Sequence, residues 1–284
     1  MAKTKLYGLI GYPVKHSYSS YMHNAAFKAL GIDAQYELFE VSPDSLDKFF
    51  KETVIKKEIC GFNVTIPHKE SALKYVNTKI PQDVERIGAA NTIKVAKDGK
   101  ELSCINTDAA GFLRHLEELK FNILDKTIAI LGAGGAAKAV SIKLAENNPK
   151  KISIFDIDKN KVNELVTRIK SVFPKINVLA VNNIEDLNIK AADLLVNATP
   201  IGMKKEDPCL VDKELLHSGL LVYDLIYNPF QTKLIEIAKQ KGLIATNGLK
   251  MLLYQGVLSF KYWIGINPPE EVMWNTLLTQ VSGK

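Results

Sequence analysis

The sequence has little cysteine and no long apolar run. Its three cysteines, Cys60, Cys104 and Cys209, are widely spaced among 284 residues. This odd number at wide spacing matches neither a disulfide framework nor a metal-ligand motif, so we expect reduced thiols and no bound metal. No apolar run approaches the ~20 residues of a membrane span, and the first residues lack the apolar core of a signal peptide. These absences predict a reduced, cytoplasmic protein without a membrane partner.

The chain also lacks a large excess of charge of one sign. Lysine and arginine number 37 and aspartate and glutamate 31, which gives a net charge of +6. A mild positive excess suits an anionic small ligand and a nucleic acid alike. The lysines are scattered along helix-like segments, and no basic stripe interleaved with aromatic residues occurs. We therefore expect no nucleic-acid partner and assign most lysines to a solvated surface.

Strand-length apolar runs alternate with helix-length amphipathic segments along nearly the whole chain. This alternation predicts α/β architecture with mainly parallel sheets, and the length favours two domains. We expect a first domain at 1–107, a second at 108–246, and a last segment, 247–284, that packs back on the first domain. The predicted strands are 6–11, 36–40, 61–65, 127–131, 151–155, 178–181, 193–197 and 220–224, with a hairpin of 91–96 and 101–105 around Asp98-Gly99.

A glycine-rich turn follows the predicted strand 127–131. Gly132-x-Gly134-x-x-Ala137 opens a predicted helix, which is the context that a dinucleotide-binding fingerprint requires. Gly132 permits the tight turn, Gly134 lets the backbone approach a pyrophosphate, and the small Ala137 allows close helix–strand packing. Asp156 ends the next strand, 24 residues beyond Gly132, where a carboxylate can accept hydrogen bonds from the adenosine ribose. The pattern predicts a Rossmann-type domain.

Asp156 also bears on the choice of cofactor. A carboxylate at this position repels a 2′-phosphate and favours NAD over NADP. Lys159 and Lys161 follow closely and offer positive charge that would meet a phosphate. The sequence leaves both NAD and NADP open.

Several polar residues fall at predicted strand ends of the first domain, where open α/β sheets bind ligands. They are Ser17, Ser19, Asn63, Thr65, Lys69, Asn91 and Asn106-Thr107-Asp108. Each alone fits a helix cap or a water-facing strand position. As a set they suit oxidation of a secondary alcohol, because a lysine amine can exchange the hydroxyl proton while a neighbouring carboxylate orients it. Hydroxyl and amide groups suit a polyhydroxylated substrate.

Motifs in order along nearly the whole chain resemble those of the shikimate dehydrogenase family. The matching segments are 11–19 (GYPVKHSYS), 23–24 (HN), 63–69 (NVTIPHK), 88–92 (GAANT), 106–108 (NTD), 132–136 (GAGGA), 197–203 (NATPIGM), 223–229 (YDLIYNP) and 248–255 (GLKMLLYQ). The resemblance implies a substrate-binding domain and a Rossmann domain with a closing cleft between them. It also implies reversible, NADP-linked reduction of 3-dehydroshikimate to shikimate, on the route to chorismate and the aromatic amino acids.

The resemblance also implies a role for each matching position. Lys69 is the expected acid/base and Asp108 its partner. The expected substrate contacts are Ser17, Ser19, Thr65, Asn91, Asp108, Tyr227 and Gln255. The expected cofactor contacts are Gly132, Ala133, Gly134, Gly135, Ala136, Asp156, Ile157, Asp158, Lys159, Lys161, Ile226 and Gly248.

Three departures from the family pattern stand out. Ser20 replaces the usual proline, and Ala90 replaces the usual valine. More important, Asp156-Ile157-Asp158 replaces the Asn-Arg-Thr that is usual in NADP-specific members. The missing arginine puts specificity for NADP in doubt.

Two alternatives remain beside a shikimate dehydrogenase. One is an NAD-dependent quinate/shikimate dehydrogenase, although both Ser17 and Ser19 favour shikimate because quinate carries an extra hydroxyl that needs room there. The other is a non-catalytic metabolite sensor on the same fold, against which Lys69 and Asp108 argue. The sequence does not decide between a monomer and a homodimer.

Overall fold

The chain divides into two compact units in the computed structural model, which describes residues 3–282. The first unit comprises Met1–Gly111 and Leu252–Lys284, and the second comprises Phe112–Met251. The two divisions fall inside helices α5 (Asp108–Glu118) and α9 (Leu249–Ile264), four and five residues after the boundaries expected from the sequence. A helix that continues from one unit into the next gives no composition change at the boundary, so the sequence places it only approximately.

The first unit is built on a five-stranded sheet. Its strand order is β2 (Ala34–Glu40), β1 (Lys5–Gly11), β3 (Ile59–Val64), β4 (Thr92–Val95) and β5 (Leu102–Ile105). The first three strands run parallel, whereas β4 and β5 are antiparallel, so this sheet is mixed. The predicted hairpin is confirmed: Gly99 has φ +72°, and Asp98 Oδ1 accepts a hydrogen bond from Lys100 N at 3.0 Å.

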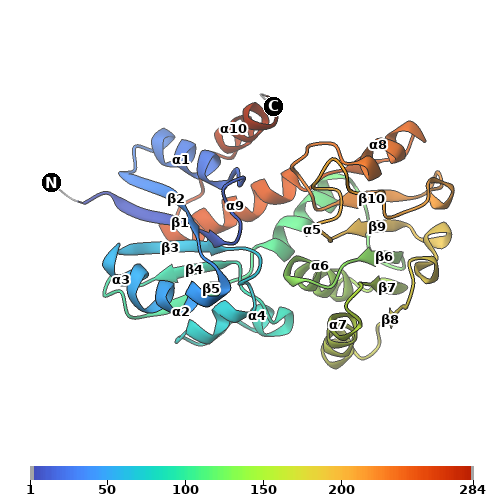
Figure 1. Ribbon diagram of the computed structural model, residues 1–284, viewed down its shortest axis with the longest axis horizontal. Coiled ribbons are helices and arrows are strands. Elements are labelled where there is room, and N and C mark those ends of the chain that lie inside the picture. Colours follow the sequence, from blue (N-terminus) through green and yellow to red (C-terminus); the bar gives the residue numbers. More distant parts are fainter. Residues whose placement is uncertain (1–2, 283–284) are drawn as a thin grey trace. The chain divides into compact units, whose positions relative to one another are not determined.

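Helices and turns cover both faces of this sheet. Tyr7 of β1 packs against Phe27 of α1 (Ser19–Ala29) and Trp263 of α9, each at 5.4 Å between ring centroids. On the opposite face Phe49 and Phe50 pack edge-on against Phe62 of β3. Their segment comprises short helical turns from Pro43 to Lys56, among them α2 (Leu46–Lys48) and α3 (Val54–Lys56). The sequence analysis did not predict α4 (Gln82–Ile87) or α10 (Glu270–Ser282), and α10 packs beside α1 (Figure 1).

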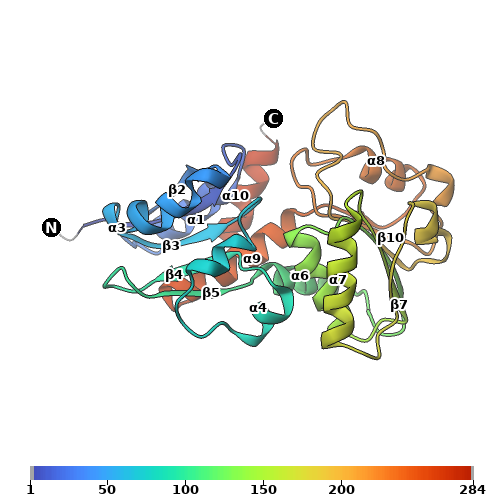
Figure 2. The same ribbon diagram turned by 60° about the horizontal axis from the view of Figure 1, so that its bottom comes forward.

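The second unit is built on a six-stranded, fully parallel sheet. Its order is β11 (Ala245–Thr246), β10 (Leu221–Asp224), β9 (Leu194–Asn197), β6 (Thr127–Leu131), β7 (Lys151–Phe155) and β8 (Val178–Ala180). Read from the β8 edge, this is the Rossmann order, with the direction of winding reversed between β6 and β9. Its helices are α6 (Gly135–Glu146), α7 (Lys159–Val172) and α8 (Lys233–Gln240), and Figure 2 shows α6 and α7 side by side.

The predicted α/β fold class is therefore confirmed in both units. The strands β6 and β7 have the predicted bounds, because each is a short run with a buried, mainly apolar centre between turn residues. Within residues 3–282 no helix combines the length and the apolar character needed to cross a bilayer.

His23 of α1 lies fully inside the first unit. Its ring stacks on Tyr36 at 4.5 Å between centroids, and Phe260 of α9 lies on a nearly parallel plane at 6.3 Å. Neither ring nitrogen has a hydrogen-bond partner. Burial lowers the pKa of His23 to about 3, because the charged imidazolium would lose its hydration there.

We predict that replacing His23 with Phe makes folding less sensitive to acid. In the unfolded chain the imidazole gains a proton below pH ~6.5, whereas the folded one stays neutral until about pH 3. Protonation of the unfolded chain therefore lowers the free energy of unfolding of the parent as the pH falls. Between about pH 7.5 and about pH 4.5, the contribution of His23 to this decrease is ~2–3 kcal/mol. Urea unfolding of the parent and of His23→Phe at both pH values measures this difference.

The cost of packing the larger Phe ring is the same at both pH values. It therefore cancels from the change in the free energy of unfolding between them. The matched control is His16→Phe, at an exposed position of the same unit. An identical pH dependence in the parent and in His23→Phe would contradict the prediction.

Candidate functional site

Lys69 and Asp108 form a partly buried ion pair in the first unit. Lys69 follows β3, and Asp108 lies in the first turn of α5. Lys69 Nζ donates to Asp108 Oδ2 at 2.6 Å, and the two side chains are 12% and 8% exposed. A buried pair is stable only when its remaining hydrogen-bonding groups are satisfied. Asp108 meets this requirement, because its second oxygen accepts a hydrogen bond from Asn91 Nδ2 at 2.9 Å.

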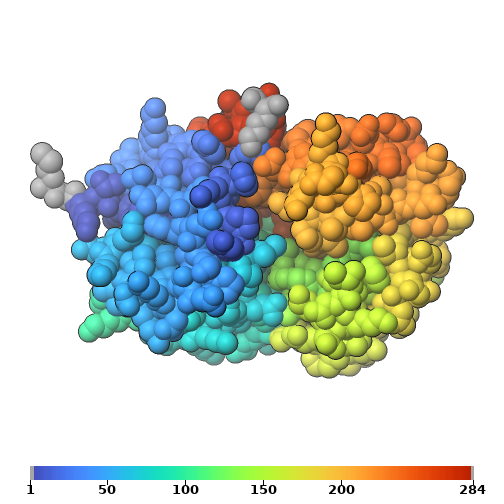
Figure 3. Space-filling view, viewed as in Figure 1, coloured from blue at the N-terminus to red at the C-terminus, as the bar shows by residue number. Residues whose placement is uncertain are grey.

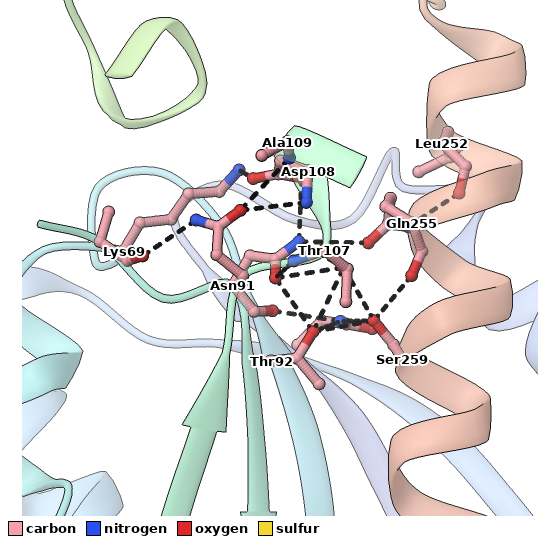
Figure 4. Close-up of polar contacts among 12 residues, drawn as sticks. Lys69, Asn91, Thr92, Thr107, Asp108, Ala109, Leu252, Gln255 and Ser259 are labelled. Atoms are coloured by element: carbon pink, nitrogen blue, oxygen red, sulfur yellow. Dashed lines mark hydrogen bonds and ion pairs between the residues drawn. The ribbon is translucent and has the colours of Figure 1, made fainter. Parts of the chain in front are cut away.

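Asn91 fixes the direction of the Asp108 carboxylate. This residue immediately precedes β4 and is 2% exposed. Its Oδ1 accepts from Thr107 N at 2.8 Å, and its Nδ2 also donates to Thr107 Oγ1 at 2.9 Å and to Gln255 Oε1 at 3.4 Å. Both ends of the amide are therefore held, and a carboxylate bound to it cannot rotate without breaking these contacts. Figure 4 shows Asn91 between Lys69–Asp108 and Gln255.

A second layer of buried polar side chains lies beneath Asn91. Ser259 Oγ accepts from Asn63 Nδ2 at 2.9 Å and donates to the carbonyl oxygen of Gln255 at 2.9 Å. Asn63 Oδ1 accepts from the Tyr36 hydroxyl at 2.8 Å, and Thr92 Oγ1 lies 2.8 Å from Ser259 Oγ. Asn63 thus belongs to the framework, with both ends of its amide engaged inside the protein. Figure 4 shows how Thr92 and Ser259 connect the sheet to α9.

The predicted serine pair lies at the beginning of α1. Ser17 Oγ accepts a hydrogen bond from Ser19 N at 3.2 Å, and both residues are buried. Thr65 follows β3, and its amide donates to the carbonyl oxygen of Ile10 in β1 at 2.9 Å. The two strands are parallel neighbours, so the serine loop and Thr65 lie at the same edge of the sheet. Among the described residues no hydrogen bond joins either serine to Lys69 or Asp108.

The glycine-rich turn of the second unit has the geometry of a dinucleotide loop. Gly132 has φ +104°, and a Cβ there would lie 2.8 Å from the carbonyl oxygen of Ala198. Gly134 caps the N-terminus of α6, and a Cβ there would meet nothing within 4 Å. The first glycine is required by the fold, whereas the second leaves open space above the first amides of α6. A pyrophosphate fits such a cradle, because helix N-terminal amides and the helix dipole attract anions.

Asp156 is joined to the glycine-rich turn. Its Oδ2 accepts from Ala133 N at 2.8 Å, and its Oδ1 accepts from Asp158 N at 2.9 Å. Asp158 in turn caps α7 by accepting from the amides of Asn160 and Lys161. Lys161 Nζ lies 3.6 Å from Asp158 Oδ2, so this lysine already has a carboxylate beside it. Ile157 is 91% exposed, and Lys159 is exposed on the first turn of α7.

Ile226 and Gly248 lie together at the ends of β10 and β11. Gly248 N donates to the carbonyl oxygen of Ile226 at 3.1 Å, and a Cβ on Gly248 would overlap the carbonyl oxygen of Leu225. Tyr227 follows Ile226 in the second unit and is partly exposed. Its expected contact with substrate stays a prediction, as do the roles of the other residues in both units.

The sequence analysis missed several residues on which these sites depend. The Thr92 hydroxyl donates to Asn91 Oδ1 at 3.0 Å, and Ser259 Oγ lies 2.8 Å from Thr92 Oγ1. Asn106, by contrast, was among the residues singled out from the sequence, and its Oδ1 accepts from the amide of Asp108 at 3.1 Å at the start of α5. In the second unit Asp224 and Asn197 join the loops after β10 and β9. One available signal was the spacing of Gln255 and Ser259, which are polar residues four apart in an apolar helix and share one face. No trio of potential metal ligands gathers anywhere in residues 3–282.

The fold and these residues define an α/β protein of the two-domain dehydrogenase class, with a Rossmann unit and a lysine–carboxylate pair in the other unit. Comparisons with known proteins identify the group within this class. Family models described as the shikimate dehydrogenase substrate binding domain, shikimate/quinate 5-dehydrogenase and the shikimate 5′-dehydrogenase C-terminal domain match residues 9–93, 115–209 and 248–278.

Individual relatives agree with the family models. The chain is 42% identical over 288 residues to a shikimate dehydrogenase (NADP(+)) from Methanocaldococcus jannaschii, with 99% of each chain covered. A crystal structure of a shikimate dehydrogenase in complex with NADP+ is 41% identical, with a TM-score of 0.88 over 98% of this chain and 96% of that one. A Listeria monocytogenes shikimate 5-dehydrogenase in complex with shikimate and NAD is 35% identical, with a TM-score of 0.84 and 96% of each chain covered. The chain belongs to the shikimate/quinate dehydrogenase family.

We predict that alanine at Gly134 weakens dinucleotide binding without loss of stability, whereas alanine at Gly132 lowers stability. Gly134→Ala should leave the thermal unfolding midpoint close to that of the parent, because its Cβ meets nothing within 4 Å. It should weaken dinucleotide binding roughly tenfold or more, since the methyl group occupies the cradle (~1.4 kcal/mol per tenfold). Gly132→Ala should lower the free energy of unfolding by about 1–3 kcal/mol, because alanine is strained at positive φ.

Calorimetric titration with NAD and NADP, together with thermal unfolding of each variant, measures both effects. Unimpaired dinucleotide binding by a stable Gly134→Ala protein would place the pyrophosphate elsewhere.

Proposed function

We propose that the protein is a shikimate dehydrogenase, which catalyses the reversible, NAD(P)-linked reduction of 3-dehydroshikimate to shikimate in aromatic amino acid biosynthesis. The observation that carries this proposal is the Lys69–Asp108 pair, with 2.6 Å between Nζ and Oδ2 and with the second carboxylate oxygen held by Asn91. Membership of the family supports the proposal. Relatives that are named shikimate dehydrogenase and that match this chain over nearly their full length support it as well.

In this proposal Lys69 is the proton-transfer group. The amine at Nζ takes the proton of the substrate hydroxyl during oxidation and returns it during reduction. Asp108 orients the amine through Oδ2, and Asn91 prevents the carboxylate from turning away. The bound nicotinamide supplies the hydride chemistry.

The remaining predicted residues bind and orient. We assign Ser17 and Ser19 to the carboxylate of shikimate, because hydroxyl donors near a helix N-terminus suit an anion. The ring hydroxyls are assigned to Thr65, Asn91, Tyr227 and Gln255. The cofactor is assigned to Gly132 through Ala136, to Asp156 through Lys159 with Lys161, and to Ile226 and Gly248. The open space at Gly134 supports the pyrophosphate position.

A quinate/shikimate dehydrogenase that uses NAD is the alternative. The family model that matches residues 115–209 covers both shikimate and quinate 5-dehydrogenases. The acidic Asp156-Ile157-Asp158 turn, with its exposed isoleucine, favours this alternative as far as the cofactor is concerned. The two buried serines favour shikimate as the substrate. We propose the cytoplasm as the location, which the free thiols of Cys60, Cys104 and Cys209 support. For the oligomeric state we keep both alternatives, a monomer and a homodimer.

We predict that Lys69→Ala lowers kcat by roughly 10²–10⁴-fold, the usual contribution of a general acid/base group. The Michaelis constant for shikimate should change much less, because the assigned binding groups remain. Steady-state rates on folded protein measure both constants. Lys74→Ala, at an exposed lysine of the same unit, is the matched control and should behave like the parent. A kcat within about threefold of the parent would remove Lys69 from this role.

We also predict that NAD is used at least as well as NADP. Asp156 places a carboxylate where the ribose 2′ position is expected, and like charges close together disfavour each other. Lys159 and Lys161 offer compensating charge, but Asp158 already lies 3.6 Å from the ammonium group of Lys161. Initial rates with shikimate and with quinate, each with NAD and with NADP, test this prediction together with the proposed substrate. We expect shikimate to be preferred to quinate.

Asp156→Asn should raise the ratio of kcat/KM with NADP to that with NAD by roughly tenfold (~1.4 kcal/mol). The ratio is the relevant quantity, because loss of a hydrogen bond to the glycine-rich turn weakens both cofactors. Asp44→Asn, at an exposed position, controls for the change in net charge. A parent enzyme that strongly prefers NADP would show that the lysines outweigh Asp156.

A further inference from the structure

Asp224 is a completely buried carboxylate to which the proposed mechanism gives no role. It ends β10 and is 0% exposed. No lysine, arginine or histidine of the described chain pairs with it, and burial raises its pKa to about 6 because the charged form loses its hydration. Burying a carboxyl without a cation is costly unless hydrogen bonds replace the lost water. Its surroundings therefore show what this group does.

Three donors from three segments converge on this carboxyl. Oδ1 accepts from Asn197 Nδ2 at 3.0 Å and from Ile226 N at 3.1 Å. Oδ2 accepts from the Thr232 hydroxyl at 2.7 Å, and Thr232 also caps α8. Asn197 ends β9, Ile226 lies in the loop after β10, and Thr232 immediately precedes α8. One side chain thus joins the loops that follow two neighbouring strands.

The contacts of Asn197 carry this constraint into the loop after β9. Its Oδ1 accepts from the amide and hydroxyl of Thr199 at 3.1 and 2.7 Å, and its Nδ2 donates to the carbonyl oxygen of Ile201 at 3.2 Å. Ala198 in the same loop lies against Gly132, the first glycine of the dinucleotide turn. Figure 3 shows the segment between β9 and β10, gold to orange, at the surface of the second unit. The buried Asp224 therefore anchors surface loops from beneath.

Two observations indicate that these loops serve one half of the dinucleotide. In a Rossmann unit the acidic residue after the second strand takes the adenosine ribose, here Asp156 after β7, so the other half of the ligand lies across the switch point, towards β9 and β10. The loop after β10 contains Ile226, whose carbonyl oxygen holds Gly248 N at 3.1 Å. Asp224 accepts a hydrogen bond from Ile226 N, and Ile226 in turn accepts one from Gly248 N. Asp224 is therefore connected to Gly248 through a single residue.

The space beside Asp224 excludes a separate ligand site. A cavity of about 10 Å³ there is lined by Asn197, Asp224 and Thr232 among others. This volume is enough for about one water molecule and holds no organic ligand. The carboxyl therefore acts on the loops and not on a ligand of its own.

We propose that Asp224 is a positioning residue for the nicotinamide half of the dinucleotide site: by accepting hydrogen bonds from Asn197, Ile226 and Thr232 it holds the loops after β9 and β10 in the shape that receives the nicotinamide and its ribose. This role deepens the proposed function and rests on it only for the identity of the cofactor. Hydrogen-bond geometry carries the role, so an amide of the same shape retains most of it.

The test measures binding of a whole dinucleotide and of a fragment without the nicotinamide half. Asp224→Ala, Asp224→Asn and the parent are titrated calorimetrically with the dinucleotide that the parent binds better and with ADP. We expect Asp224→Ala to bind the dinucleotide at least tenfold more weakly and ADP within about twofold of the parent, with Asp224→Asn within about threefold for both ligands. Hydrogen exchange without ligand should accelerate over 198–203 and 225–227 in Asp224→Ala but not over 132–137.

Ser153→Ala is the matched control. Ser153 is as deeply buried in the same sheet, on β7, and its hydroxyl has no hydrogen-bond partner, so its removal should leave both affinities and the exchange of both loops unchanged. Thr232→Val removes one donor to the carboxylate and is the second variant if Asp224→Ala fails to fold. It should change the dinucleotide affinity in the same direction, by a smaller factor, and leave the ADP affinity unchanged.

Three outcomes would overturn the assignment. The first is that Asp224→Ala, or Thr232→Val if the alanine variant does not fold, binds the dinucleotide as tightly as the parent. The second is an equal loss of ADP binding and dinucleotide binding. The third is that Asp224→Asn binds the dinucleotide as weakly as Asp224→Ala. None of these measurements uses shikimate. A parent that binds the dinucleotide but does not oxidise shikimate would contradict the proposed function. The binding measurements on the Asp224 variants could still be interpreted in that case.

Discussion

The amide of Asn91 is the point on which the polar interior of the first unit depends. Its oxygen and nitrogen contact Thr107, Asp108 and Gln255, which belong to the approach to α5, its first turn and α9. Leaving one buried polar group of such a network without a partner costs ~1–3 kcal/mol. The direction of the Asp108 carboxylate, and with it the position of the Lys69 amine, is therefore a property of the packed core.

Much of this architecture could be predicted from the sequence, since it depends on local patterns. The short strands β6 and β7, the glycine turn between β6 and α6, and the Asp98-Gly99 hairpin are complete within a few residues each. The motif residues Lys69, Asn91 and Asp108 could also be singled out, and the structure brings them into contact. Their roles remain predictions, because proximity alone does not show which of them contacts a substrate.

The remainder depends on pairs of residues far apart in the chain, and a single sequence does not reveal such pairs. Ser259 lies next to Thr92 only because α9 returns to the first sheet, and Tyr36 reaches Asn63 only because β2 and β3 flank β1. Asp224 is similar: the strand pattern placed it at the end of β10, but its burial and its three donors follow from the packing of β9, β10 and α8 around it. The helix α10 was missed altogether.

The double attachment of Asp156 has a consequence for altering cofactor preference by design. Because its carboxylate holds the amides of Ala133 and Asp158, a change at this position disturbs the turn that every dinucleotide needs. Ile157, by contrast, is almost fully exposed, so its side chain can be exchanged at little cost to the fold. We therefore expect a substitution at residue 157 to alter discrimination at the ribose with less disturbance of the glycine-rich turn than a substitution of Asp156, which serves both the turn and the ribose.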